Sequence, residues 1–213
     1  MISYAILLGG TLVATPRLKR QLAGARFIAA DGGMAHAALF AAQVELWVGD
    51  FDSTDKALAR HHAHVERQAH PAAKDATDGE LAIEAALQRG AEKVILVGGL
   101  GGASDHALAH LTQLLALAGQ GIACFASSGD EEAWPLLPGE MTLDSPPGTR
   151  MSVIGFSPLK AISLSGVRWP LDRRDVPLGS SLTMSNEITS AGAATISLEA
   201  GHGVTVLTFK PQD

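Results

Sequence analysis

The chain has 213 residues, of which 46% are hydrophobic and 18% are charged. This composition supports a well-buried core and excludes a disordered chain. The formal net charge of −6 disfavours nucleic acid as the main partner, because a phosphate backbone is bound through clustered Lys and Arg and the sequence has no basic run. A single cysteine, Cys124, excludes an intrachain disulfide framework, and we expect it to be a small core residue.

The opening "MISYAILLGG" is only briefly apolar and lacks the basic segment that begins a signal peptide. No uncharged stretch reaches the length of about 18 residues that a membrane span needs. We therefore expect a cytoplasmic protein with no membrane partner.

Short apolar runs alternate with helical patterns over the first 126 residues. The apolar runs predict strands at 2–8, 25–30, 45–49, 64–68, 93–98 and 122–127. The helical patterns lie near 16–23, 33–42, 54–62, 77–89 and 105–118. Such alternation predicts βαβ units, and hence a parallel, Rossmann-like sheet with helices on both faces.

Two of these helices carry clear end signals. Thr77 is the expected N-cap of the helix at 77–89, with Glu80 completing a capping box and Gly90 ending the helix in a left-handed conformation. The helix that follows "GGAS" is expected to begin near Ser104 or Asp105, either of which can cap it.

The pattern changes after about residue 130. Prolines break any long helix there, and the remainder gives short alternating runs at 150–156, 161–167, 181–187, 194–200 and 204–210. Turn residues separate these runs, which indicates an antiparallel all-β sandwich or barrel. We expect two domains, 1–130 and 131–213, with the boundary somewhere in 128–140.

The unusual residues of the first domain all follow predicted strands. They are Gly9 and Gly10, then Asp31, Gly32 and Gly33, then Asp50 and Asp52, then Lys74, Asp75, Thr77 and Asp78, and finally Ser104, Asp105 and His106. Open α/β sheets bind ligands beyond the carboxyl ends of their strands. The convergence of these loops therefore predicts a ligand site at that edge, although any one loop could be a tight strand-to-helix turn.

Five aspartates crowd this predicted edge: Asp31, Asp50, Asp52, Asp75 and Asp78. Two carboxylates about 4 Å apart repel by roughly 4 kcal/mol at an effective dielectric constant of about 20, so a cation is expected between them. Mg²⁺ prefers a few carboxylates together with water and substrate phosphates. Two structural alternatives stay open: Asp75 or Asp78 could favour a helix dipole, and Asp52 could cap the next helix.

Histidines stand out at two places in the sequence. "HHAHVERQAH" at 61–70 lacks metal-ligand spacing, which indicates incidental histidines at a solvated helix end. His106, beside Asp105, is either a ligand-facing residue or a packed one.

Six short motifs occur in an order that resembles the thiamine pyrophosphokinase family. They are "ADGG" (30–33), "GDFDS" (49–53), "KDATD" (74–78), "GG-x-x-DH" (101–106), "GVRWPL" (166–171) and "MSNE" (184–187). The resemblance implies a homodimer that transfers the pyrophosphoryl group of ATP to the hydroxyl of thiamine and releases AMP. It also implies an α/β domain that holds ATP and Mg²⁺, and a β-sandwich that completes the thiamine pocket across the dimer.

The resemblance also assigns roles to individual residues. Asp50, Asp52 and Asp78 are expected to hold Mg²⁺ and, with Asp105, to serve catalysis. The expected ATP-binding residues are Gly10, Asp31, Gly32, Gly33, Lys74, Asp75 and Thr77. The expected thiamine-binding residues are Asp105, Trp169, Ser185 and Asn186. An indole face suits the fixed charge of the thiazolium ring, although Trp169 could instead be a sandwich-core residue.

The sequence departs from the family pattern at Ala103, where the family usually has an arginine. An arginine there could bind phosphate in a bidentate manner. Lys74, Arg168, Arg173 and Arg174 are candidate substitutes, and Lys74 is the best placed. Two alternatives follow from this departure: a pyrophosphokinase for another hydroxymethyl heterocycle, such as a pterin, or a non-catalytic protein that binds thiamine or nucleotide.

Overall fold

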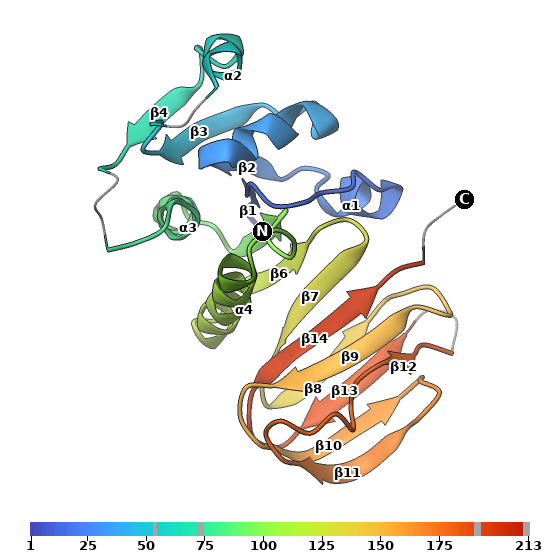
Figure 1. Ribbon diagram of the computed structural model, residues 1–213. Helices are drawn as coiled ribbons and strands as arrows, with labels where there is room; N and C mark the ends of the chain where they lie inside the picture. Colours follow the sequence, from blue (N-terminus) through green and yellow to red (C-terminus); the bar gives the residue numbers. More distant parts are fainter. Residues whose placement is uncertain (53–54, 72–74, 190–192, 211–213) are drawn as a thin grey trace.

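The structure is a computed structural model that describes residues 1–52, 55–71, 75–189 and 193–210. The α/β part is drawn in blue and green in Figure 1, and the β-sandwich that follows it in yellow to red. Lys74, one of the predicted ATP-binding residues, lies outside the described residues.

Six parallel strands form the α/β part of a larger sheet. They are β1 (Ser3–Leu7), β2 (Arg26–Ala30), β3 (Val44–Gly49), β4 (Glu66–Ala69), β5 (Lys93–Val97) and β6 (Ala123–Ser127). Their order in the sheet is β6-β5-β1-β2-β3-β4. The change of direction from β1–β2 to β1–β5 creates a topological switch point, where ligands are expected in open α/β sheets.

Helices cover both faces of this sheet, as predicted. They are α1 (Pro16–Gln21), the 3₁₀ helix η1 (Asp31–Phe40), α2 (Lys56–His61), α3 (Asp78–Gln88) and α4 (Ser104–Gly119). Side chains alternate along β1, so Tyr4 and Ile6 enter the core beneath α3 and α4, whereas Ala5 and Leu7 enter the core beneath α1 and η1.

The end signals of the helices had different outcomes. Thr77 is the N-cap of α3 and its Oγ1 accepts a hydrogen bond from the backbone N–H of Glu80 (3.2 Å), and Gly90 has φ +80°, so both predictions are confirmed. The predicted cap of α4 was wrong. That helix begins at Ser104 with Ala103 as its N-cap and no side-chain capping bond, while Asp105 Oδ1 accepts from the N–H of His106 (2.9 Å).

The second half is an antiparallel β-sandwich, which confirms the predicted fold class. Its strands are β7 (Glu131–Leu136), β8 (Gly139–Leu143), β9 (Arg150–Gly155), β10 (Leu159–Ser165), β11 (Leu171–Val176), β12 (Asn186–Glu187), β13 (Ala194–Leu198) and β14 (Gly203–Thr208). One layer, β11-β10-β13-β8, packs on β12-β9-β14-β7 through a core rich in Leu, Ile and Val.

The strand predictions for this half were incomplete. The run at 181–187 forms strand only at Asn186–Glu187, and β7, β8 and β11 were not predicted. Pro135 lies within β7 and Pro138 directly before β8, so prolines that excluded helix also obscured two strands.

The main sheet continues across the predicted domain boundary. β7 pairs antiparallel with β6 through Ala126–Ala133 and Ser127–Glu132, and β14 then pairs with β7. Ten strands therefore form one continuous sheet that serves both halves. The division into domains 1–130 and 131–213 stays a prediction.

Candidate functional site

A cavity of about 580 Å³ lies beyond the carboxyl ends of β1, β2 and β3. The starts of α3 and α4 complete its wall. Its lining residues are Leu8, Gly9, Gly10, Ala30, Asp31, Gly32, Asp50, Ala76, Thr77, Asp78, Gly79, Gly98, Gly101, Gly102, Ala103, His106 and His110. The position is the edge that the sequence predicted for ligand binding.

The cavity gathers many of the predicted nucleotide and metal residues. Those that line it are Gly10, Asp31, Gly32, Asp50, Thr77 and Asp78. Among the described residues of the α/β part, four others with predicted roles do not line it: Gly33, Asp52, Asp75 and Asp105. The last three are exposed side chains, whereas Gly33 is buried.

Close backbone packing explains two of the glycines. A Cβ atom on Gly10 would lie 2.3 Å from the carbonyl oxygen of Gly98 and 2.4 Å from that of Gly101, and one on Gly33 would lie 2.0 Å from the carbonyl oxygen of Leu7. Neither position can accept a side chain. Gly33 therefore brings the β2 loop against β1, which explains its presence without a ligand contact.

Two helix N-termini border the cavity. Ala76, Thr77, Asp78 and Gly79 form the start of α3, and Ala103 is the N-cap of α4. The first-turn N–H groups and the helix dipole give such ends a partial positive charge that suits phosphate. Because Ala103 provides no side-chain cap, the start of α4 is suited to an external anion.

Three carboxylates line the cavity, contributed by Asp31, Asp50 and Asp78. Oδ1 of Asp50 accepts a hydrogen bond from the backbone N–H of Asp52 (3.1 Å), which closes a tight turn through Phe51. No Lys or Arg occurs among the described lining residues. The cavity is thus acidic, and an anionic ligand needs a cation to accompany it.

The carboxylates of the cavity fit Mg²⁺ in one particular way. Within the described ranges, no three His, Cys, Asp or Glu side chains gather closely enough to form a complete metal site. Mg²⁺ usually takes one or two carboxylates and fills its remaining positions with water and substrate phosphates. Asp50 and Asp78 therefore fit a metal whose coordination is completed by a nucleotide.

Two histidines of the cavity had no role assigned from the sequence. His106 is exposed and lines the cavity, so it is not a packed core residue. His110, four residues later on α4, is buried and donates from Nδ1 to the carbonyl oxygen of Gly99 (2.9 Å). Burial lowers the pKa of His110 and so favours the neutral imidazole, and the hydrogen bond to a carbonyl oxygen places its proton on Nδ1. The i, i+4 spacing from His106 was the available signal.

The predicted thiamine residues of the sandwich lie outside this cavity. Trp169 is 54% exposed, so it is not a core residue, and the guanidinium of Arg168 lies 4.9 Å from its ring centre. Asn186 is buried and holds the turn at Trp169: its Oδ1 accepts from the backbone N–H of Trp169 (3.1 Å) and its Nδ2 donates to the carbonyl oxygen (2.8 Å). Ser185 is exposed beside it.

Most candidate substitutes for the missing arginine are engaged elsewhere or lie away from the cavity. Arg173 pairs with Glu199 (2.6 Å), and Arg168 stacks on Trp169. Arg168, Arg173 and Arg174 do not line the cavity.

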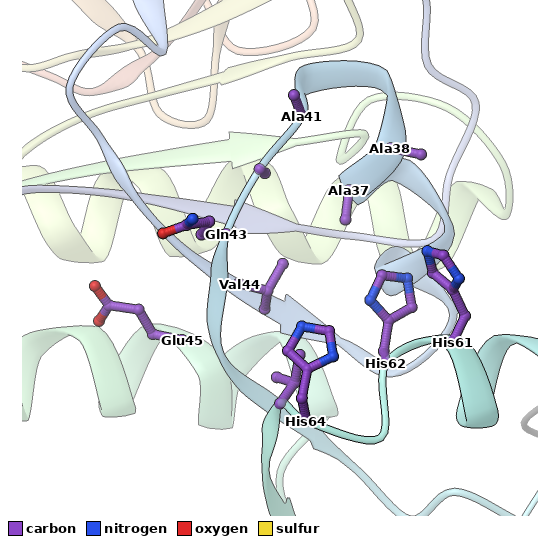
Figure 2. Close-up of a pocket in the computed structure, with 11 residues that line it drawn as sticks. Ala37, Ala38, Ala41, Gln43, Val44, Glu45, His61, His62 and His64 are labelled. Carbon is purple, nitrogen blue, oxygen red and sulfur yellow. The ribbon is translucent and has the colours of Figure 1, made fainter.

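A second pocket, of about 530 Å³, lies between η1, β3 and α2 (Figure 2). His61, His62 and His64 form one wall at the end of α2, and the exposed side chains of His61 and His64 agree with the solvated helix end that the sequence predicted. Glu45, also in the pocket wall, is already paired with Arg26 through two hydrogen bonds of 2.7 and 2.6 Å. His62 packs edge-on against Trp47. This contact gives His62 a packing role, whereas His61 and His64 are exposed.

Comparison with known proteins bears on both halves of the chain. A family model described as "Thiamin pyrophosphokinase, catalytic domain" matches residues 21–126, and one described as "Thiamin pyrophosphokinase, vitamin B1 binding domain" matches residues 140–202. A thiamine pyrophosphokinase of Bacillus subtilis (strain 168) is 30% identical over 144 residues, which are 66% of this chain and 67% of that protein. The chain belongs to the thiamine pyrophosphokinase family.

Solved thiamine pyrophosphokinases share the whole fold. The enzyme from Bacillus subtilis superposes with a TM-score of 0.84 at 22% identity, covering 98% of this chain and 100% of its own. A family protein from Enterococcus faecalis gives 0.82 at 25% identity, covering 99% and 100%. The thiamin pyrophosphokinase of Candida albicans gives 0.81 at 13% identity, covering 98% and 89%. The family resemblance is thus confirmed in sequence and in fold.

Proposed function

We propose that the chain is a thiamine diphosphokinase, which transfers the pyrophosphoryl group of ATP to the hydroxyl of thiamine and releases AMP. One observation carries the proposal: the family's nucleotide and metal motifs meet in a single cavity that combines two helix N-termini with three carboxylates. The cavity lies in the half that matches the catalytic family model, and the sandwich matches the vitamin B1 binding model.

The cavity is the proposed site of MgATP. The glycine loops and the starts of α3 and α4 offer backbone N–H groups to the phosphates. Asp50 and Asp78 are the proposed Mg²⁺ ligands, Asp31 adds to the acidic wall, and Asp52, which is exposed next to Asp50, would reach the metal through a turn of its side chain. When bound, Mg²⁺ neutralises phosphate charge and orients the β- and γ-phosphates.

The proposed reaction is a single in-line displacement at the β-phosphorus of ATP. The thiamine hydroxyl oxygen bonds to the β-phosphorus, the bond from that phosphorus to the oxygen bridging to the α-phosphate breaks, and AMP leaves with the bonding electrons. The hydroxyl proton passes to a base. Positioning and charge neutralisation supply most of the rate enhancement in such transfers.

The proposed thiamine site needs two separate parts of the fold. Asp105 lies in the first turn of α4, whereas Trp169 and Ser185 are exposed on the sandwich and do not line the cavity. Asn186 keeps its proposed role as the residue that fixes the Trp169 turn. We propose that a homodimer brings Trp169 of one copy to Asp105 of the other, so that the indole and carboxylate flank the thiazolium charge.

The two alternatives from the sequence are less well supported. A pterin-type pyrophosphokinase would not explain the match of the sandwich to a vitamin B1 binding model. A non-catalytic protein that binds only thiamine would keep the sandwich but would not need the acidic cavity that the structure retains despite Ala103. A non-catalytic nucleotide-binding protein would need that cavity and differs from the kinase in turnover.

The test is the formation of AMP from MgATP by the purified chain, with and without thiamine. AMP that appears only with thiamine supports the proposal. ADP as the nucleotide product, or AMP formation that is independent of thiamine, would contradict it. Saturable thiamine binding without turnover would favour the binding protein.

A further inference from the structure

Two acid-bearing turns of the cavity have unusual backbone conformations. Asp31 follows β2 with φ +43°, and Phe51, between Asp50 and Asp52, follows β3 with φ +62°. Residues with a Cβ atom rarely occupy this left-handed region, and β-carbon crowding makes it unfavourable. Such conformations persist only where the surrounding structure holds them, and they gather at functional sites.

One side chain contacts both turns. The indole of Trp47 is fully buried, and its Nε1–H donates to the carbonyl oxygen of Asp31 (2.9 Å). The same indole meets the ring of Phe51 edge to face, with centroids 5.2 Å apart and an interplanar angle of 87°. Trp47 therefore joins the end of β2 to the end of β3 at the two places where the acidic residues leave the sheet.

A cation on β4 completes this arrangement. The guanidinium of Arg67 lies 4.8 Å from the ring centre of Trp47 and 5.4 Å from that of Phe51. Its Nη2 also donates to the carbonyl oxygen of Ala59 (2.8 Å), which anchors it to α2. Both aromatic rings are thus held against the sheet edge.

The two acid-bearing turns lie next to each other. Gly49 precedes Asp50, and a Cβ atom there would lie 3.4 Å from Cα of Asp31. The gap between the two turns is therefore about the size of one methyl group, which makes them direct neighbours. The hydrogen bond from the indole of Trp47 restrains the position of the Asp31 carbonyl group.

We propose that Trp47 is a positioning residue for the metal site: it holds the turn that carries the proposed ligand Asp50 against the turn of Asp31, so that Asp50 is placed to bind the divalent cation. This inference rests on the proposed role of Asp50 as a metal ligand. It predicts that loss of the indole N–H weakens metal binding and lowers kcat, with little effect on the KM for thiamine. A purely structural Trp47 would change stability alone.

Trp47→Phe removes the N–H and keeps an aromatic ring. Trp134→Phe is a matched control, because Trp134 belongs to the same sheet, donates its Nε1–H to Glu132 (3.0 Å) and stacks on Phe125 with centroids 4.4 Å apart. Mn²⁺ serves as the probe, with free Mn²⁺ measured by electron paramagnetic resonance in the presence and absence of a non-hydrolysable ATP analogue. Thermal midpoints, kcat and the KM for thiamine are measured on the same samples.

For Trp47→Phe we expect Mn²⁺ affinity to fall about three- to tenfold, the range that one lost hydrogen bond produces. Trp134→Phe should leave Mn²⁺ affinity within about twofold of wild type, whatever its thermal midpoint. Unchanged Mn²⁺ affinity in Trp47→Phe, or equal losses in both variants, would overturn the proposal.

Two further outcomes distinguish a failure of the positioning role of Trp47 from a failure of the proposed function. In the first, the folded wild type binds Mn²⁺, the Trp47→Phe variant binds it more weakly, and neither forms AMP in response to thiamine. This result would support the positioning role of Trp47 and contradict the proposed kinase activity. If Trp47→Phe does not fold, Arg67→Met carries the test, because it removes the cation over both rings and spares the core. Unchanged Mn²⁺ affinity in Arg67→Met would then overturn the proposal.

Discussion

Asp50 is the residue on which the proposed metal site most directly depends. It lines the cavity and accepts the N–H of Asp52. Asp50→Asn keeps that acceptor and removes the charge, so we expect Mg²⁺-dependent turnover to fall by about a hundredfold or more, equivalent to about 3 kcal/mol, at an unchanged thermal midpoint. Steady-state rates across a Mg²⁺ titration measure the effect.

The control for this variant is Asp55→Asn on the neighbouring helix α2. Asp55 is the N-cap of that helix, and its Oδ1 accepts from Ala57 (2.7 Å) and Leu58 (3.0 Å). We expect Asp55→Asn to leave the Mg²⁺ requirement unchanged. Equal turnover in Asp50→Asn and wild type would contradict the metal assignment.

His110 gives the protein a pH-dependent stability. Burial lowers its pKa in the folded state, so the unfolded chain takes up the proton first as the pH falls. Its contribution is therefore fully present above the ordinary histidine pKa of about 6.5, and is lost as the pH falls from there towards the folded pKa. His110→Asn, which offers an amide N–H in place of Nδ1, should reduce this dependence.

Urea midpoints at pH 7.5 and 5.5 measure the effect of His110. Burial and the neighbouring His61 and His64 also lower the pKa of His62. His62 therefore contributes a similar pH dependence of stability to both proteins. The informative quantity is therefore the difference between wild type and His110→Asn. An identical pH dependence in the two proteins would show that His110 does not titrate during unfolding.

Individual residues were only partly predictable from the sequence. Motif order located Asp31, Asp50 and Asp78, because the carboxyl ends of parallel strands meet at one edge. It did not show that Gly33 packs on Leu7 or that the Asn186 amide is engaged by the Trp169 backbone. Such roles depend on contacts between segments that are distant in the sequence.

At the scale of elements, the start of α4 is the informative case. Ala103 lines the cavity as an N-cap without a side-chain bond. We expect Ala103→Arg to raise kcat/KM for ATP by about five- to tenfold, since a guanidinium there can bind phosphate in a bidentate manner. Ala103→Ser, which adds a cap without a charge, is the control and should have little effect on kcat/KM.

Lys74→Met shows whether another residue already supplies the missing charge. If Lys74 substitutes for the family arginine, Lys74→Met should lower kcat/KM for ATP, and Ala103→Arg should restore it in the double variant. A neutral Lys74→Met together with a neutral Ala103→Arg would mean that the cavity needs no cationic side chain at either position.

The elements of the two halves differed in how well the sequence predicted them. Alternation of apolar runs and helical patterns located β1 to β6 and the helices, because five of these strands are mostly buried and helices such as α3 and α4 have an apolar face. β4 was still found although all four of its residues are exposed. β7, β8 and β11 were missed because Pro135 and Pro138 and the charged run at 172–175 mask the strand pattern.

At the scale of the whole molecule, the continuous ten-stranded sheet has a thermodynamic consequence. β6, β7 and β14 join the two halves through ladders of backbone hydrogen bonds. Among the described residues, every helix lies before residue 120, so circular dichroism at 222 nm reports mainly on the first half. We expect both halves to unfold in one cooperative transition.

Leu207→Ala tests this coupling. Leu207 is fully buried in β14 within the sandwich core, so the substitution should cost about 2–5 kcal/mol. If the chain unfolds as one cooperative unit, the circular dichroism at 222 nm and the tryptophan fluorescence should both shift to the same lower denaturant midpoint. A helical transition that stays unchanged would show that the halves unfold independently.

The transfer of a β-phosphate label from ATP to thiamine is the measurement that tests the proposed function most directly. With ATP labelled at the β-phosphorus, the account predicts labelled thiamine diphosphate and unlabelled AMP, because attack at that atom carries the β- and γ-phosphates together. A label that stays in ADP while only the γ-phosphate moves, or a label that never reaches thiamine, would contradict the account.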